Sequence, residues 1–216
     1  MKLTANIIGA TGLVGKQLVE MLLENEKFEK VRIFVRRDPQ IVHPKLETFI
    51  VDFSDKETWA NQLQGDVLFS VLGTTLKQAG NKEKQYEIDF SYNLNFAQIA
   101  KENGIESYVL VSSVGANSKS SVFYTRMKGE LDEAVQKIGF KNLIILRPAS
   151  LTGKRKEKRI AEVISVPILN FLTRIVMKKY RPISDRTVAK AMINAVLFPN
   201  NKKAIWEGHE IFELAR

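Results

Sequence analysis

The sequence has no cysteine and only two histidines, His43 and His209, among its 216 residues. Disulfide frameworks, thiolate catalysis and multi-histidine metal sites are therefore excluded, and a reducing, cytoplasmic environment is expected. No stretch of about 18 consecutive apolar residues occurs, so no transmembrane helix is expected. We also find no signal-peptide pattern at the start of the sequence. Both histidines stand in polar surroundings, and surface positions are expected for them.

The composition is that of a globular protein, with 44% hydrophobic and 26% charged residues. The sequence contains no internal repeat, no low-complexity segment and no flexible linker, and its length suits one domain. We therefore expect a single domain over residues 1–216. Residues 1–150 would form its cofactor-binding core, and residues 151–216 its C-terminal helices and a small substrate-side region.

The net charge of +9 is concentrated near the C-terminus, because residues 151–216 carry +8 and residues 1–150 carry only +1. Such a basic region suits a nucleic acid, an anionic membrane or a phosphorylated ligand, and it is equally typical of a solvated surface. Residues 160–177 are apolar and precede several cations, a pattern that a membrane-surface helix also shows. We prefer a helix that walls the substrate cleft, and we expect neither nucleic-acid binding nor stable membrane association.

Strand-like and helix-like segments alternate along the first two thirds of the chain. The expected strands are residues 3–8, 31–35, 46–51, 66–72, 108–111 and 143–146. The expected helices are residues 17–23, 86–103, 124–138 and 185–198, the last capped by Ser184 or Asp185. Short apolar strands that alternate with helices indicate βαβ units, so the predicted fold class is α/β. We expect a Rossmann-type, doubly wound parallel sheet with helices on both faces.

A glycine motif follows the first expected strand and reads Gly9-Ala10-Thr11-Gly12-Leu13-Val14-Gly15. Glycine permits the tight turn and lets the backbone approach a pyrophosphate closely. The helix that follows presents N–H groups and a positive dipole end to the phosphates. The surrounding strand and helix favour a dinucleotide site over a ligand-free turn. Gly9, Thr11, Gly12, Leu13, Val14 and Gly15 are therefore expected to bind the cofactor.

The second expected strand ends in Arg36-Arg37, where an NAD site would carry a carboxylate for the ribose 2′-hydroxyl. Two guanidiniums would instead bind a 2′-phosphate through forked, charge-assisted hydrogen bonds. NADPH or NADP is therefore the expected cofactor. The alternative is that both arginines are ordinary surface charges at a strand end.

Two further positions fit the rim of the cofactor pocket. Asp52 follows the third expected strand, where its carboxylate would accept from the adenine amino group, although it would equally well cap the next helix. Leu72-Gly73-Thr74 ends the fourth expected strand. Ligands of open α/β sheets lie against such carboxyl ends.

Tyr124 and Lys128 are spaced to share one face of the expected helix 124–138. An ammonium beside a phenol stabilises the phenolate, so Tyr124 would exchange a proton with a carbonyl or alcohol oxygen. Lys128 would also hold the nicotinamide ribose hydroxyls. Ser112 and Ser113 end the fifth expected strand and would hydrogen-bond the same substrate oxygen. The tyrosine–lysine spacing is common by chance, and the order of the preceding motifs gives it weight.

These motifs together resemble the atypical branch of the short-chain dehydrogenase/reductase superfamily, and within it the Tat-interacting-protein subfamily of NADPH-binding oxidoreductases. The resembling stretches are residues 9–15, 36–37, 72–75, 111–116, 124–130, 146–148 and, later, 188–191. The resemblance implies a catalytic set of Ser113, Tyr124 and Lys128, with Ser112 and Leu151 also at the cofactor. It does not decide which of the two serines is catalytic. The gap between Ser113 and Tyr124 is shorter than in sugar-nucleotide epimerases of the superfamily.

The resulting hypothesis is an NADPH-dependent oxidoreductase that transfers hydride to a small carbonyl substrate, acting as a monomer or homodimer. The alternative is an NADPH-binding regulatory or sensor protein with little or no turnover, docking to a partner through its basic C-terminal third. The tyrosine–lysine pair favours the enzyme, because a sensor has no need of it.

Overall fold

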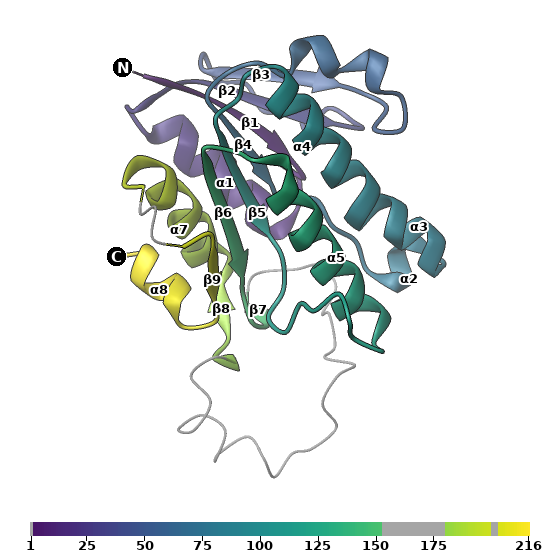
Figure 1. The fold of residues 1–216 in the computed structure, drawn as a ribbon. Helices are drawn as coiled ribbons and strands as arrows, with labels where there is room; N and C mark the ends of the chain where they lie inside the picture. The colour runs from purple at the N-terminus through teal and green to yellow at the C-terminus, as the bar shows by residue number, and fades with distance from the viewer. Residues whose placement is uncertain (1, 153–179, 200–202) are drawn as a thin grey trace.

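The computed structural model describes residues 2–152, 180–199 and 203–216. Its centre is one parallel sheet of seven strands in the order β3-β2-β1-β4-β5-β6-β9 (Figure 1). The strands are β1 (Leu3–Ile8), β2 (Phe28–Val35), β3 (Leu46–Ile50), β4 (Val67–Ser70), β5 (Ser107–Val111), β6 (Asn142–Arg147) and β9 (Ile205–Glu207). The fold is the Rossmann-like, doubly wound α/β fold that the alternation of segments predicts.

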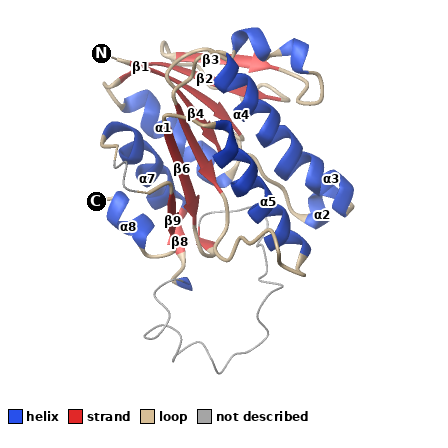
Figure 2. Ribbon diagram, in the orientation of Figure 1, coloured by secondary structure: helices blue, strands red, loops and turns tan. Residues whose placement is uncertain are grey.

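Helices cover both faces of the sheet (Figure 2). One face carries α1 (Leu13–Glu24), α7 (Asp185–Leu197) and α8 (Glu210–Leu214), and the other carries α4 (Tyr92–Glu102) and α5 (Phe123–Ile138). The shorter elements are α2 (Leu76–Ala79), α3 (Lys82–Tyr86), a π-helical turn (Glu87–Ser91) and the 3-10 turns η1 (Lys56–Thr58) and η2 (Ala60–Gln62). Beyond β6, β7 (Leu151–Thr152) pairs with β8 (Ile183–Ser184) in a separate two-stranded sheet.

The strands divide their side chains between two hydrophobic cores, one under each layer of helices. Val67 and Phe69 of β4 pack into the core under α1 and α7, whereas Leu68 between them packs into the core under α4 and α5. Successive side chains of a strand point to opposite faces of the sheet. Both faces of this sheet are covered, which explains why the central strands β4 and β5 are nearly continuous apolar runs.

The six strands expected from the sequence are all present, with ends that shift by at most three residues. The expected single helix over residues 86–103 is interrupted, because residues 87–91 form the π-helical turn and regular α-helix starts only at Tyr92. Ser184 caps α7 by accepting a hydrogen bond from the Thr187 N–H. The expected helix at residues 160–177 lies outside the described residues.

The sequence reading missed the seventh strand, β9. It has three residues, and it pairs with β6 although some sixty residues separate the two in the chain. No helix in the part of the chain that the structure describes is long and apolar enough to cross a membrane.

The chain order places the point for ligand binding between β1 and β4. From β1 the chain moves outward through β2 and β3, then returns to β4 on the other side of β1 and continues outward through β5 and β6. Ligands of such sheets bind at the carboxyl ends of the strands, at this reversal. The loops after β1, β2, β4 and β5 all meet at that edge.

Candidate functional site

The glycine loop joins β1 to α1, and two of its glycines admit no side chain. Gly9 has φ +82°, and a Cβ there would lie 2.5 Å from the backbone N of Leu72. A Cβ on Gly15 would lie 2.2 Å from the carbonyl oxygen of Gly9. The loop therefore needs glycine at these positions to close against β4 and to bring α1 up to the sheet.

The N-terminus of α1 is not capped by any side chain of the described residues. Gly12 is its N-cap, and its first turn contains no acidic residue. Thr11 and Gly12 are exposed, Leu13 is half-buried, and the Val14 side chain belongs to the core. A helix end of this kind offers backbone N–H groups and a positive dipole to an anion. The residues that the motif predicted thus form a geometry suited to a pyrophosphate.

Arg36 and Arg37 lie exposed just beyond the end of β2. Neither guanidinium is paired with a carboxylate of the described residues. Asp38, the nearest carboxylate in the chain, instead accepts the Gln40 N–H at 2.7 Å within a local turn. Both guanidiniums therefore remain available to a ligand.

Asp52 follows β3 and forms a local turn. Its Oδ1 accepts from the N–H of Ser54 at 2.9 Å and from the Ser54 hydroxyl at 2.6 Å. The Ser54 hydrogen bonds hold the pKa of Asp52 below its ordinary value, so it remains a carboxylate. The alternative that Asp52 caps the next helix is wrong, because Asp55 caps η1.

The loop after β4 approaches the buried interior of the site. Leu72 and Thr74 are half-buried and Gly73 is exposed. The Thr74 N–H donates to Oδ2 of Asp89 at 2.7 Å, and a Cβ on Gly73 would lie 3.0 Å from Oδ1 of the same carboxylate. The expected pocket rim is thus attached to a buried aspartate that the sequence reading did not identify.

Tyr124 and Lys128 lie one turn apart at the start of α5, as their spacing predicts. Tyr124 is 37% exposed, whereas Lys128 is 3% exposed. The Lys128 Nζ lies 6.0 Å from the centroid of the Tyr124 ring and 3.1 Å from Oδ1 of Asp89. Burial is the largest single influence and opposes the charge on Lys128, but Asp89, with smaller contributions from Tyr124 and Asp132, holds the pKa of Lys128 above its ordinary value. The ammonium is therefore preserved inside the protein beside an accessible phenol.

The two serines after β5 differ in exposure. Ser112 is 6% exposed, and its hydroxyl is buried on the side of Asp132. Ser113 is half-buried and makes only a 3.4 Å contact with the carbonyl of Val114. Of the two hydroxyls, that of Ser113 is the more accessible to a ligand.

Beyond Lys128, α5 carries a third inward-facing polar residue. Asp132 is 1% exposed, lies one further turn along the helix, and its Oδ2 accepts from Nε of Arg147 at 2.8 Å. Burial raises the pKa of Asp132. Tyr124, Lys128 and Asp132 follow at intervals of four residues, and this signal in the sequence would have identified Asp132.

Two other residues of the site had weaker signals. Asp89 appears in the sequence as one charge within an amphipathic segment, between Ile88 and Phe90. Gly129 lets α5 approach the preceding loop, since a Cβ there would lie 2.2 Å from the backbone N of Ser118. Leu151, expected at the cofactor, is half-buried in β7, where it pairs with Ile183.

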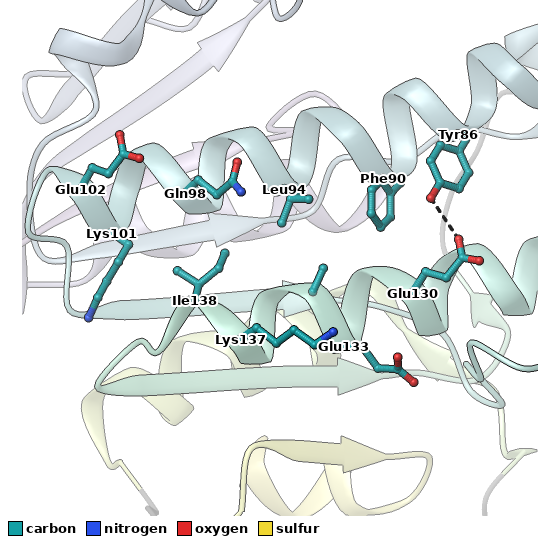
Figure 3. Close-up of a pocket in the computed structure, with 11 residues that line it drawn as sticks. Tyr86, Phe90, Leu94, Gln98, Lys101, Glu102, Glu130, Glu133, Lys137 and Ile138 are labelled. Carbon is teal, nitrogen blue, oxygen red and sulfur yellow. Dashed lines mark hydrogen bonds between the residues drawn. The ribbon is translucent and has the colours of Figure 1, made fainter.

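A separate groove of about 670 Å³ runs along the outer surface between α4 and α5 (Figure 3). Phe90, Leu94 and Ile138 line it with apolar surface, and the Tyr86 hydroxyl donates to Glu130 at 3.0 Å at one end. Burial, together with this hydrogen bond, raises the pKa of Tyr86 to about 12. No residue of the expected site lines this groove.

Several relatives share most of this chain. One is the protein fmp52, mitochondrial, of Aspergillus fumigatus, which is 38% identical over 206 residues, or 88% of this chain and 86% of the relative. Another is the protein FMP52, mitochondrial, of Candida glabrata, with 43% identity over 159 residues, 72% of this chain and 67% of the relative.

These names correct one expectation. The cytoplasmic location expected from the absence of cysteine and of a signal-peptide pattern is contradicted, because the relatives are named as mitochondrial proteins. The physical reason is that a lack of cysteine excludes disulfides but does not distinguish one compartment from another.

Solved structures of low sequence identity share the fold. An ADP-L-glycero-D-manno-heptose-6-epimerase of Helicobacter pylori has a TM-score of 0.70 and 20% identity, with 97% of this chain and 80% of that chain covered. A UDP-glucose 4-epimerase of Thermus thermophilus, solved in complex with NAD, has a TM-score of 0.70 and 15% identity, with 97% and 81% covered. This chain therefore shares the fold of these two epimerases.

The family of this chain is assigned from its sequence, because structures of such low identity show only the fold. A family model described as NAD(P)H-binding matches residues 9–199, which include the glycine loop, both arginines, Lys128 and all of α7. The chain belongs to the NAD(P)H-binding family.

Proposed function

We propose that this protein is an NADPH-dependent oxidoreductase that reduces a small carbonyl compound, with Tyr124 as the proton donor. The observation that carries the proposal is the buried Lys128 ammonium, which lies beside the accessible Tyr124 ring and next to the Gly73 loop at the ligand-binding edge of the sheet. The resemblance of the sequence to the Tat-interacting-protein subfamily of NADPH-binding oxidoreductases also supports NADPH as the cofactor.

The residues present fit a nicotinamide dinucleotide. Gly9 and Gly15 let the loop close tightly against β4 and α1, Gly12 is exposed, and no side chain of the described residues caps the end of α1, so a pyrophosphate would meet bare backbone there. When bound, the cofactor would supply the hydride. Arg36 and Arg37 would select its phosphorylated form, because their guanidiniums pair with no described carboxylate and suit a 2′-phosphate.

The side chains of α5 and β5 would manage the proton. Tyr124 would donate its phenolic proton to the substrate oxygen as negative charge develops there, and Ser113 would hydrogen-bond the same oxygen. The Lys128 ammonium would stabilise the resulting phenolate through its charge and hold the ribose hydroxyls. Asp52 would accept from the adenine amino group at the far end of the site.

The experiment compares two tyrosine-to-phenylalanine variants. Tyr124→Phe removes only the hydroxyl, so NADPH affinity should persist while carbonyl reduction falls by about 10²-fold or more, the usual scale for a general acid. Tyr86→Phe is the matched control, because its hydroxyl lies in the outer groove and bonds Glu130. Activity is followed by NADPH absorbance across a panel of aldehydes, ketones and quinones.

Three outcomes separate enzyme from sensor. A loss confined to Tyr124→Phe supports the proposal, and a normal rate for that variant removes Tyr124 from the mechanism. Tight NADPH binding by the wild type without turnover on the whole panel would instead assign the protein to regulation. Sedimentation of the same samples distinguishes the monomer from the homodimer.

A further inference from the structure

Asp89 joins two parts of the site that are distant in the chain. It lies in the π-helical turn before α4 and is 1% exposed. Its Oδ2 accepts the Thr74 N–H at 2.7 Å, and its Oδ1 lies 3.1 Å from the Nζ of Lys128. One buried carboxylate therefore connects the loop after β4 to the start of α5. π-helical turns are frequent at functional sites.

Lys128 has no other carboxylate at ion-pair distance within the described part of the chain. Asp132, the next inward-facing carboxylate of α5, is bonded to Arg147 at 2.8 Å. The titratable groups that face Lys128 are Asp89 from the π-helical turn, and Tyr124 and Asp132 from its own helix. Asp89 thus supplies the close negative charge that a buried ammonium requires.

Gly73 separates the ion pair from the outer surface of the loop. A Cβ on Gly73 would lie 3.0 Å from Oδ1 of Asp89 and 3.9 Å from the Nζ of Lys128, and Gly73 is itself exposed. The pair consequently lies directly beneath a bare stretch of backbone, at the edge of the sheet where ligands bind.

We propose that Asp89 is a positioning residue, which holds the Lys128 ammonium beneath Gly73, in place for the ribose of the nicotinamide, and ties it to the Thr74 amide. This inference rests on the proposed function. Asp89 itself contacts no substrate; it acts through Lys128. The site is therefore organised before the cofactor arrives, and the cost of ordering a long lysine side chain is already met in the folded protein.

Removal of the carboxylate should uncouple Lys128 from the site. A buried ammonium without a partner is costly, so it gives up its proton more readily or turns towards solvent. Because Asp89 raises the pKa of Lys128, the Asp89→Asn substitution should lower that pKa. Cofactor affinity in this variant should then fall as pH rises from neutral into the alkaline range, whereas wild-type affinity stays constant over that range.

The test compares Asp89→Asn with Asp66→Asn in the full chain. Asp66 makes the same kind of contact at the opposite end of β4, where its Oδ2 accepts the Thr4 N–H at 2.7 Å. NADPH is titrated by calorimetry at neutral and alkaline pH. Asp89→Asn should bind NADPH about tenfold or more weakly, as expected on removal of one partner of a buried charge pair, with a larger deficit at alkaline pH. Asp66→Asn should match the wild type.

A second measurement needs no substitution at Asp89. In protein labelled with 13C at the lysine ε-carbon, the Lys128 signal is assigned by its absence in Lys128→Met and titrated without NADPH. Titration above the ordinary lysine value supports the pairing, and titration at or below that value overturns it, even if Asp89→Asn fails to fold. Wild-type affinity in a folded Asp89→Asn variant also overturns the inference. Absence of NADPH binding by the wild type refutes the proposed function instead.

Discussion

Cations are arranged differently in the two halves of the site. In the half proposed to bind the nucleotide, here called the nucleotide half and made of β1, β2, β3 and α1, Arg36 and Arg37 are exposed and unpaired with any described carboxylate. In the half proposed to carry out the reaction, here called the catalytic half and made of β4, β5, β6, α4 and α5, Lys128 and Arg147 are paired with buried carboxylates. A free surface cation is available to a phosphate of the ligand. A paired, buried cation is held in one place before any ligand binds, and its partner must be present for the fold to tolerate it.

The halves agree in one respect, since each contains a helical glycine packed against backbone. Gly15→Ala and Gly129→Ala would each place a Cβ 2.2 Å from a backbone atom that cannot move aside. We expect each to lower the free energy of unfolding by about 3 kcal/mol or more, the upper range for overpacking. Urea denaturation measures this. Gly12→Ala is the control, because its Cβ would lie 3.2 Å from the Gly9 oxygen and needs only a small shift. Two variants as stable as this control would show that the close approaches are not required.

The pair formed by the buried Asp132 and the half-buried Arg147 tests the catalytic half. Arg147→Met keeps much of the apolar stem but leaves the Asp132 carboxylate unpaired, at a cost of about 3 kcal/mol near neutral pH. Burial already raises the pKa of Asp132, and removal of Arg147 should raise it further. Below the ordinary pKa of an aspartate the carboxyl is neutral in every state, so the deficit should be small there. It should grow as pH rises through the raised pKa of the wild type. Chemical denaturation at several pH values would contradict this if the deficit were constant.

The two arginines test the nucleotide half. In Arg36→Ala/Arg37→Ala, NADPH should bind about 30-fold more weakly, or ~2 kcal/mol, because charge-assisted hydrogen bonds to the 2′-phosphate are lost. NADH affinity should not change, because NADH has no 2′-phosphate. The free energy of unfolding should not change either, because neither guanidinium pairs with a described carboxylate. Lys27→Ala serves as the control, because it removes a positive charge directly before the first residue of β2, at the end of the strand away from Arg36 and Arg37. Calorimetric titration with both cofactors measures the effect; equal losses for NADPH and NADH would exclude a 2′-phosphate contact.

The smallest effect is expected for a surface ion cluster of the nucleotide half. Glu47 on β3 accepts from Arg32 and pairs with Lys30, each at 2.8 Å, and its side chain is 37% exposed. The Lys30 hydrogen bond, with further help from Arg32, lowers the pKa of Glu47 against the opposing effect of burial. Glu47→Gln should cost less than about 1 kcal/mol at neutral pH, because solvent screens the cluster. The difference from wild type should vanish as pH falls through the lowered pKa. A cost equal to that of Arg147→Met would remove the distinction between the halves.

Local sequence patterns predicted most of the nucleotide half. Gly9, Gly12 and Gly15 act through backbone shape, and Arg36-Arg37 lies at a strand end, so each can be recognised within a few residues of the chain. In the catalytic half the same reasoning identified Tyr124 and Lys128 from their helical spacing. It did not identify Asp89, because nothing near Asp89 in the chain indicates that Lys128 will be buried against it.

The interruption before α4 and the seventh strand were missed for a related reason. The π-helical turn at residues 87–91 brings Asp89 inward within a segment whose apolar pattern resembles one regular helix. β9 has only three residues, and it is recognised as a strand only because it pairs with β6. The choice between Ser112 and Ser113 likewise needed burial, since both follow β5 and have the same chemistry.

The sequence by itself determined the fold class, the glycine turn after β1, the cationic end of β2 and the spacing of Tyr124 and Lys128. All of these follow from backbone preference and periodicity, which act over a few residues. Only the tertiary structure decided that Lys128 is buried, that Asp89 is its partner, and that Asp132 is paired with Arg147 rather than with Lys128. Ion pairing in a protein interior depends on which groups lose their water together, and that is set by the packing of α4 and α5 on the sheet.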